Sequence, residues 1–287
     1  MARPEMTPDF VVVGHVTLDQ TENGTWPGGA ALYAALTAHR LGYSAGLLTS
    51  FGPDFPEEVF PPGLEVINVP AAKTTTFSHE TGPRGRRLTL LHRATDLQVE
   101  DVPASWKSAG LALLCPVVNE VDPELSAWFT EGAVGVAVQG WMRERGANGA
   151  VTPASWKDAG VVLEHVQTIL LSREDMRGFE DEVLEWFQRV PLGVVTLGRD
   201  GALLFVNGER YAVQAEVAQE TDPTGAGDVF AAAFLIEYQR EGDPWEAAAA
   251  AACAAACSVE AEGLGGIPDR LALEARLAHY HRRLVGG

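Results

Sequence analysis

The chain has 287 residues and a formal net charge of −18 at pH 7, and only three of its 21 basic residues are lysine. An acidic surface repels nucleic-acid backbones and anionic membranes, so we expect neither as a partner. An anionic ligand must then be held locally, by backbone amides, a few arginines or a metal ion. The length and the hydrophobic share of 46% suit one large α/β domain with a well-filled core.

The three cysteines give no disulfide pattern. Cys253 and Cys257 are four residues apart in an alanine-rich stretch with no neighbouring histidine, which favours buried helix thiols over a zinc site. The first nine residues lack the pattern of a signal peptide, and the longest apolar run, 247–257, is too short to span a bilayer. We therefore expect a cytoplasmic protein.

The first fifty residues have a β-α-β pattern. The apolar run DFVVVGH at 9–15 predicts a buried strand, and AALYAALTAHRLG at 30–42 predicts a helix that ends at a glycine. SAGLLTSFG at 44–52 predicts the second strand. Such a unit usually opens a sheet of parallel strands.

The next stretch lacks helical periodicity. EVINV, TTTFSHE and RRLTLLH are short β-branched runs separated by PAAK and TGPRG, which is typical of hairpins. We expect a small antiparallel sheet here that projects from the main domain. Together with the turn-rich segment after the first strand, it would form a lid from about 15–26 and 63–95.

Alternation returns beyond residue 110. Apolar runs at 111–115, 134–140, 168–172 and 193–198 predict strands, and helices are expected from Pro123, from Pro153 and at 180–190. A hairpin is expected at 202–213, and the chain from 225 onward is expected to be mostly helical. The predicted fold is a single α/β domain, 1–287, with a doubly wound, mainly parallel sheet flanked by helices.

Several common active-site motifs are absent or misplaced. GYSAG at 42–46 fits the pattern of a hydrolase nucleophile elbow, but Ser44 follows a predicted helix and precedes a strand, which is the reverse of the order that the elbow needs. No lysine follows a glycine, so there is no Walker P-loop. The glycine-rich turn of a dinucleotide site after the first strand is also missing.

DPTGAGD at 222–228 is the strongest local signal in the sequence. Its glycines let the amides of Gly225, Ala226 and Gly227 turn toward one point, and the helix that begins there adds its positive dipole end. This arrangement binds an anion without lysine. Asp228 stands beside that anion site in the first helical turn. A simple capping turn explains one carboxylate and one glycine, but not the whole motif.

DPTGAGDVFAAAF resembles the C-terminal signature of the ribokinase-like (PfkB) carbohydrate kinases. Other elements agree in order: Asp19 after the first strand and the pair Gly28 and Gly29 resemble the family's sugar-binding residues, and TLGRDG at 196–201 resembles the segment beside the nucleotide phosphates. The resemblance covers essentially the whole chain. It implies an ATP-dependent kinase in which Asp228 is the general base, the amides of 225–228 stabilise the transferring group, and the nucleotide contacts Thr196, Gly198, Gly201 and Thr224.

The resemblance also has departures. Where the family has N-x-x-E near Mg²⁺, this chain has Ser172 and Asp175, so that Asp175 would contact the metal through water. Tyr33 replaces a sugar-contacting asparagine of the ribokinases, which disfavours ribose. VAVQGWMR and TTTF resemble the inositol kinase branch, and this resemblance makes Gln139 and Arg143 candidates for binding a polyol. Their alternative interpretation is a strand end followed by a surface arginine.

The leading hypothesis is therefore a kinase for a sugar or cyclic polyol, with an inositol-like substrate favoured. A nucleoside kinase of the same fold is the first alternative, and a non-catalytic sugar- or nucleotide-binding homologue is the second. ATP and Mg²⁺ are the expected cofactors, and a requirement for a monovalent cation is left open. The exposed strand edges of the lid favour a homodimer, with a monomer as the alternative.

Overall fold

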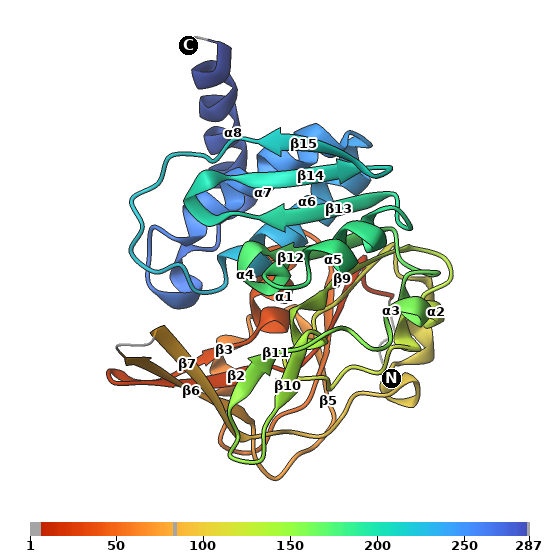
Figure 1. The fold of residues 1–287 in the computed structure, drawn as a ribbon, viewed down its shortest axis with the longest axis vertical. Helices are drawn as coiled ribbons and strands as arrows, with labels where there is room; N and C mark the ends of the chain where they lie inside the picture. The colour runs from red at the N-terminus through yellow and green to blue at the C-terminus, as the bar shows by residue number, and fades with distance from the viewer. Residues whose placement is uncertain (1–6, 83–84, 286–287) are drawn as a thin grey trace.

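A computed structural model describes residues 7–82 and 85–285. Its main feature is a nine-stranded sheet in the order β15-β14-β13-β12-β9-β8-β1-β4-β5 (Figure 1). Seven of these strands form one parallel run, and the hairpin of β14 and β15 adds two antiparallel strands at one edge. The strands are β1 (Phe10–Val13), β4 (Ala45–Thr49), β5 (Glu65–Asn68), β8 (Leu111–Leu114), β9 (Ala133–Ala137), β12 (Thr168–Ser172), β13 (Leu192–Thr196), β14 (Ala202–Val206) and β15 (Glu209–Val213).

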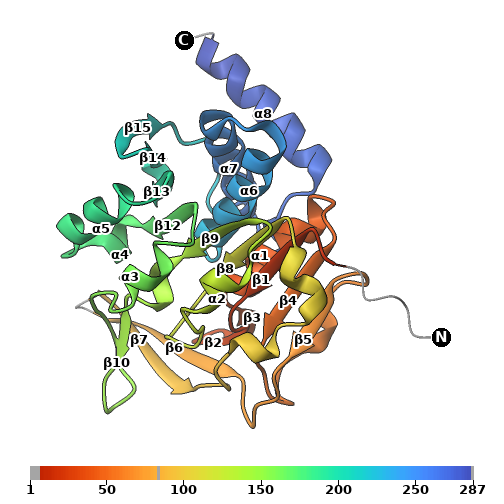
Figure 2. The same cartoon turned by 90° about the vertical axis from the view of Figure 1, so that its right-hand side faces the viewer.

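Helices cover both faces of this sheet (Figure 2). Alternate residues of β1 belong to different cores: Phe10 and Val12 lie in the core beneath α1, α6 and α7, whereas Val11 and Val13 lie in the core that contains residues of α2, α3 and α5. The helices are α1 (Ala30–Arg40), α2 (Leu125–Trp128), α3 (Ala159–Val162), α4 (Arg173–Met176), α5 (Glu180–Phe187), α6 (Ala226–Glu241), α7 (Pro244–Ser258) and α8 (Arg270–Val285). Short 3₁₀ turns are η1 (Glu57–Val59), η2 (Val99–Asp101), η3 (Ala104–Ser108), η4 (Val138–Gly140), η5 (Gly198–Asp200) and η6 (Gly263–Gly266).

A second, four-stranded sheet projects from the main one and forms the lid. Its order is β3 (Gly24–Gly28), β2 (Thr17–Thr21), β6 (Thr75–Gly82) and β7 (Gly85–His92). The outer two ladders are antiparallel, but β2 and β6 are parallel. A hairpin of β10 (Arg143–Arg145) and β11 (Val151–Pro153) lies beside β7, where the amide of Leu90 donates to the carbonyl of Gly149 over 2.8 Å (Figure 1).

The fold class predicted from the sequence is confirmed, and three details of it are wrong. EVIN at 65–68 pairs in parallel with β4 in the main sheet, so the lid strands of that region begin at Thr75 and not near residue 63. The segment at Pro153 ends a strand, and the helix expected there is the single turn α3. The helix expected from Pro123 is likewise the single turn α2. The secondary structure of these segments depends on their tertiary contacts, because their local preferences for helix or strand are weak.

The topology brings loops that are distant in sequence to one edge of the sheet. From β1 the chain crosses to β4 on one side and later returns to β8 on the other, so the strand order reverses between β1 and β8. Open α/β sheets bind ligands beyond the carboxyl ends of their strands at such a point. The segments after β1, β8, β9 and β12, and the start of α6, should therefore form the functional site.

Two further expectations concern partners. No helix within the described ranges is long and apolar enough to cross a membrane. The homodimer expected through the lid stays a prediction: β3 ends the lid sheet, and its Trp26 is 57% exposed.

A substitution at Gly140 would test how tightly the chain packs at the carboxyl ends of the central strands. A Cβ there would lie 2.1 Å from the backbone of Pro116, so Gly140→Ala should destabilise the protein by about 2 kcal/mol or more in chemical denaturation. Gly160→Ala is the matched control, because nothing lies within 4 Å of its Cβ position, and it should gain about 0.5–1 kcal/mol from its place in a helix. Equal stability of the two variants would contradict the packing described here.

Candidate active site

Asp228 lies in the first turn of α6, directly after a left-handed turn. Gly225 is the N-cap of α6 with φ 75°, a conformation that favours glycine. A Cβ on Gly225 would also lie 2.3 Å from the ring of Tyr33, which is 2% exposed in α1. The close approach of the glycine to this ring fixes where α6 begins. It also places Tyr33 beneath the turn, while its expected contact with a substrate stays a prediction.

The environment of Asp228 favours its neutral form. Burial raises the pKa of its carboxyl group to about 7, and the negative charges of Asp175 and Asp19 act in the same direction, whereas Arg143 opposes them. The residue is only partly buried, and no hydrogen bond to its carboxylate is found among the described residues. A carboxylate at a helix start normally has its charge stabilised. Here burial outweighs that effect, which is typical of a functional group.

The backbone amides of the turn are not all available to a ligand. The amide of Ala226 donates to the carbonyl of Pro223 over 3.3 Å, and that of Asp228 donates to Gly225 over 3.0 Å. Within the described ranges, no hydrogen bond is found for the amides of Gly225 and Gly227. The predicted anion site of four amides therefore narrows to these two, which lie at the positive end of a helix of 16 residues.

Arg143 brings a cation to the carboxylates. The Nη1 of Arg143 donates to the carbonyl of Val117 over 3.0 Å, and the backbone carbonyl of Arg143 accepts a hydrogen bond from Asn119 Nδ2 over 2.5 Å. Burial lowers the pKa of the guanidinium, and the charges of Asp175, Asp228 and other acidic groups raise it in opposition. Guanidinium keeps its charge under such conditions. Arg143 is half-buried, and its contact with a polyol stays a prediction.

Asp175 tests the expected magnesium site. One carboxylate oxygen accepts hydrogen bonds from the amide and hydroxyl of Ser172, and the other accepts from Gln139 Nε2 over 3.1 Å. Asp175 and Ser172 form a capping box at the start of α4, so both oxygens already have partners. No group of three or more acidic, histidine or cysteine side chains suited to a metal occurs in the described part of the chain. These residues fit an outer, water-mediated contact and not a direct cage.

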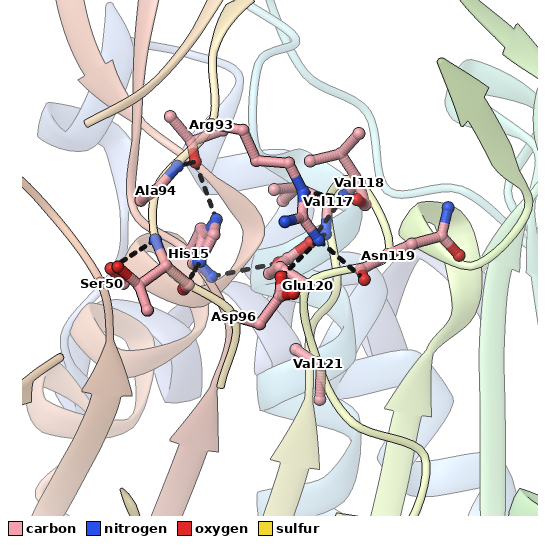
Figure 3. Close-up of polar contacts among 12 residues, drawn as sticks. His15, Ser50, Arg93, Ala94, Asp96, Val117, Val118, Asn119, Glu120 and Val121 are labelled. Atoms are coloured by element: carbon pink, nitrogen blue, oxygen red, sulfur yellow. Dashed lines mark hydrogen bonds and ion pairs between the residues drawn. The ribbon is translucent and has the colours of Figure 1, made fainter. Parts of the chain in front are cut away.

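Glu120 organises the loop that holds Arg143 (Figure 3). Its carboxylate is 1% exposed and accepts hydrogen bonds from the amides of His15, Val117 and Val118 at 2.7–3.2 Å. Arg93 donates to the carbonyls of the same loop. This loop presents the Val117 carbonyl to Arg143, so the buried carboxylate determines the position of the guanidinium.

His15 connects this loop to the lid. Its Nδ1 lies 2.8 Å from the hydroxyl of Thr75, which begins β6, and its Nε2 lies 2.8 Å from the carbonyl of Thr95. Burial lowers the pKa of His15, so the ring is neutral at pH 7. The base of the lid is thereby fixed to the loop that carries Glu120.

Asp19 lies on the lid strand β2, close to Gly28. Its Oδ1 accepts a hydrogen bond from His79 Nε2 over 3.0 Å, and a Cβ on Gly28 would lie 2.4 Å from its Oδ2. Gly29 has φ 97° and lies against the carbonyl of His15. The glycine pair predicted on the substrate side therefore gives space to Asp19 and to the start of α1.

The expected nucleotide residues lie on neighbouring loops. Thr196 ends β13, Gly198 begins η5 with φ 60°, and Gly201 has φ 92° with its Cα against the carbonyl of Val213. The amide of Thr224 donates to Asp222 Oδ1 over 2.9 Å. Their contact with a nucleotide stays a prediction.

Residues 162–270 match the family model described as pfkB family carbohydrate kinase. This range contains both the TLGRDG and DPTGAGD motifs. The chain is therefore similar to PfkB-type kinases, and the comparisons support a kinase enzyme. The resemblance predicted from the sequence is thus confirmed.

Relatives extend this similarity to most of the chain. Cytidine kinase of Thermococcus kodakarensis is 25% identical over 258 residues, which are 83% of this chain and 91% of the relative. Inositol 3-kinase of Arabidopsis thaliana is 27% identical over 220 residues, 73% of this chain and 60% of the relative. A pyrophosphate-dependent kinase in the ribokinase family, complexed with a pyrophosphate analog and myo-inositol, has a TM-score of 0.77 and 18% identity, with 93% and 99% of the two chains covered. Arabidopsis thaliana ribokinase complexed with ribose and ATP has a TM-score of 0.72 and 20% identity, with 95% and 99% covered.

Sequence reasoning found most of the carboxylates and missed their partners. The sequence predicted Asp19, Asp175, Asp228 and Arg143 as site residues. The charges of the other three all act on Asp228, which indicates that they lie near it in one site. Glu120 and His79 were not predicted. A charged residue inside the apolar segment after β8 was a signal for the first. Nothing in the sequence pairs His79 with Asp19, because 59 residues separate them along the chain.

The raised pKa of Asp228 predicts that Asp228→Asn stabilises the protein in a pH-dependent manner. The folded state holds this proton more tightly than the unfolded chain, whose pKa is near 3.8, so the wild type loses stability as pH rises from about 4 through 7. The variant should show a higher Tm at pH 8 and a smaller gain at pH 5.5. Asp181→Asn, an exposed carboxylate in the first turn of α5, should show no gain at either pH. The same gain at both pH values would exclude the raised pKa as its cause.

Proposed function

We propose that the protein transfers the γ-phosphoryl group of ATP to a hydroxyl group of a neutral sugar or cyclic polyol, with an inositol-like acceptor favoured. The observation that supports this most is Asp228: a partly exposed carboxylate at a helix start, beside Arg143, with a pKa raised to about 7. General bases work best when their pKa is near the working pH.

In this mechanism Asp228 accepts the proton of the acceptor hydroxyl while its oxygen attacks the γ-phosphorus. The bond between that phosphorus and the bridging oxygen breaks, and ADP leaves. The amides of Gly225 and Gly227 and the guanidinium of Arg143 stabilise the charge on the phosphoryl oxygens. Mg²⁺, when bound with ATP, neutralises further phosphate charge, and Asp175 would hold it through water.

The charges of the site support a neutral acceptor. The negative charges of Asp19 and Asp175 both act on Asp228, and Arg143 is the cation that acts on Asp228 among the described residues. An acceptor that already carries a phosphate group would add negative charge beside them. Hydroxyl groups, in contrast, are good donors to carboxylates.

A nucleoside kinase is the second candidate, and the cytidine kinase relative favours it. A nucleobase usually stacks on an open aromatic face. Three aromatic side chains that could supply such a face, those of Tyr33, Phe77 and Trp141, are 2%, 3% and 4% exposed. Their burial favours the polyol over the nucleoside.

The Asp228→Asn variant should still bind ATP but should lose most of its phosphoryl-transfer activity. The amide keeps the shape of the side chain but cannot accept the hydroxyl proton, so we expect kcat to fall by about 10²- to 10⁴-fold, while calorimetry shows ATP binding within threefold (roughly) of wild type. In the wild type, kcat/KM for the acceptor should rise with pH and reach half its plateau near pH 7, because only ionised Asp228 acts as a base. Undiminished turnover in Asp228→Asn would remove this residue from the proposed role.

An acceptor panel separates the two candidates. Wild-type protein with Mg²⁺ and either ATP or pyrophosphate would be offered myo-inositol, fructose, ribose, adenosine, cytidine and fructose 6-phosphate, and product formation followed by phosphorus NMR. We expect turnover of a neutral sugar or polyol with ATP, and none of the phosphorylated sugar. If only a nucleoside is phosphorylated, the protein is a nucleoside kinase and the polyol proposal is wrong. If only pyrophosphate serves as donor, the proposal of ATP is wrong.

A further inference from the structure

We propose that His79 is a positioning residue of the acceptor site: it holds Asp19 so that one carboxylate oxygen is directed to a hydroxyl group of a neutral acceptor. This inference rests on the proposed function and names a residue that recognises its substrate. It begins from the contact of 3.0 Å between His79 Nε2 and Asp19 Oδ1, which joins lid strands β6 and β2.

Strand register puts both side chains on one face of the lid. Asp19 lies opposite Phe77 in the parallel ladder, and His79 is two residues further along β6, so that all three share one face. Phe77 is 3% exposed and belongs to the core shared with α1 and α6. The part of this face around Phe77 therefore packs on the main domain, whereas Trp26, opposite Asp19 on β3, is 57% exposed.

The two oxygens of Asp19 have different surroundings. Oδ1 accepts from His79, while Oδ2 has a long contact of 3.4 Å with the Thr17 hydroxyl. The Cβ position of Gly28 lies 2.4 Å from Oδ2, where a carbon atom would clash. Glycine at position 28 therefore lets the chain pack closely against Asp19. The single long contact of Oδ2 leaves this oxygen able to accept a further hydrogen bond from a hydroxyl group.

The charge of Asp19 also makes its orientation important for the site. The charge of Asp19 contributes to the raised pKa of Asp228. The Nε2–H of an imidazole ring can donate to a carboxylate oxygen. With Oδ1 occupied by His79, Asp19 cannot rotate freely, and an acceptor binds to an oriented carboxylate without the entropic cost of ordering it.

The alternative is that the pair only holds the lid together. The β2–β6 ladder is already paired at four positions, from Thr17 with Thr75 to Gln20 with Ser78, so the lid has backbone contacts enough. Both side chains are also about one-fifth exposed, at 19% and 21%. A bond needed only for stability would change the Tm, whereas a positioning residue changes the KM for the acceptor.

The test compares His79→Leu, which cannot donate, with His79→Gln, whose Nε2 can, using any acceptor that the wild type phosphorylates. His79→Leu should raise the KM for the acceptor about tenfold or more, with kcat and the KM for the donor within roughly threefold, and His79→Gln should restore most of the loss. His92→Leu is the matched control, an exposed histidine on the lid strand β7, and should leave all three constants unchanged.

A double-mutant cycle keeps the inference testable even where His79→Leu lowers stability. If His79 acts through Asp19, then adding His79→Leu to Asp19→Asn should raise the acceptor KM by less than about twofold over Asp19→Asn alone. An unchanged acceptor KM in His79→Leu, or full additivity in the cycle, would overturn the inference while the kinase activity stands. A wild-type protein inactive on every acceptor would overturn the proposed function, and this inference with it.

Discussion

The buried carboxylate of Glu120 is the interaction on which the geometry of the site depends. It is satisfied by three backbone amides, and these belong to the exit of β1 and to the loop after β8. Since β1 and β8 are neighbours at the point where the strand order reverses, one side chain fixes both loops there. A buried charge without partners is costly, so the amides must converge on it. The Val117 carbonyl, and with it Arg143, is positioned as a consequence.

The hydrogen bonds around Glu120 and His15 also determine where the lid lies relative to the main sheet. His15 donates its amide to Glu120, while its ring contacts Thr75 at the start of β6 and the carbonyl of Thr95 beyond β7. The segments that enter β6 and leave β7 therefore meet at one neutral histidine, which itself lies between β1 and β2. The lid strand β7 has a separate contact, from Thr89 to Ala150, with the hairpin that begins with Arg143. Lid and guanidinium are thus mechanically connected at two places.

Local patterns in the sequence predicted the sheet, α1, α6 and the DPTGAGD turn, because each depends on residues that are neighbours in the chain. The assignment of residues 65–68 to the lid failed, since an apolar strand can pair with either sheet and only the tertiary structure decides. The availability of the turn amides was also overestimated. Ala226 and Asp228 use theirs in the first turn of α6, a detail of backbone geometry that glycine spacing does not contain. His79 was missed because its contact with Asp19 depends on strand register.

An acidic protein with three lysines has to supply positive charge to a phosphoryl group from somewhere, and burial determines which residue can do so. A lysine as enclosed as Arg143 would lose its proton readily, whereas guanidinium stays charged. That retained charge also acts on Asp228, because it lowers a pKa that burial and two neighbouring carboxylates raise. These opposing effects give Asp228 a pKa of about 7. At a much lower pKa the carboxylate would be too weak a base, and at a much higher pKa it would already be protonated. Moving Arg143 away would therefore disturb the base as well as the anion site, which makes the loop held by Glu120 part of the chemistry.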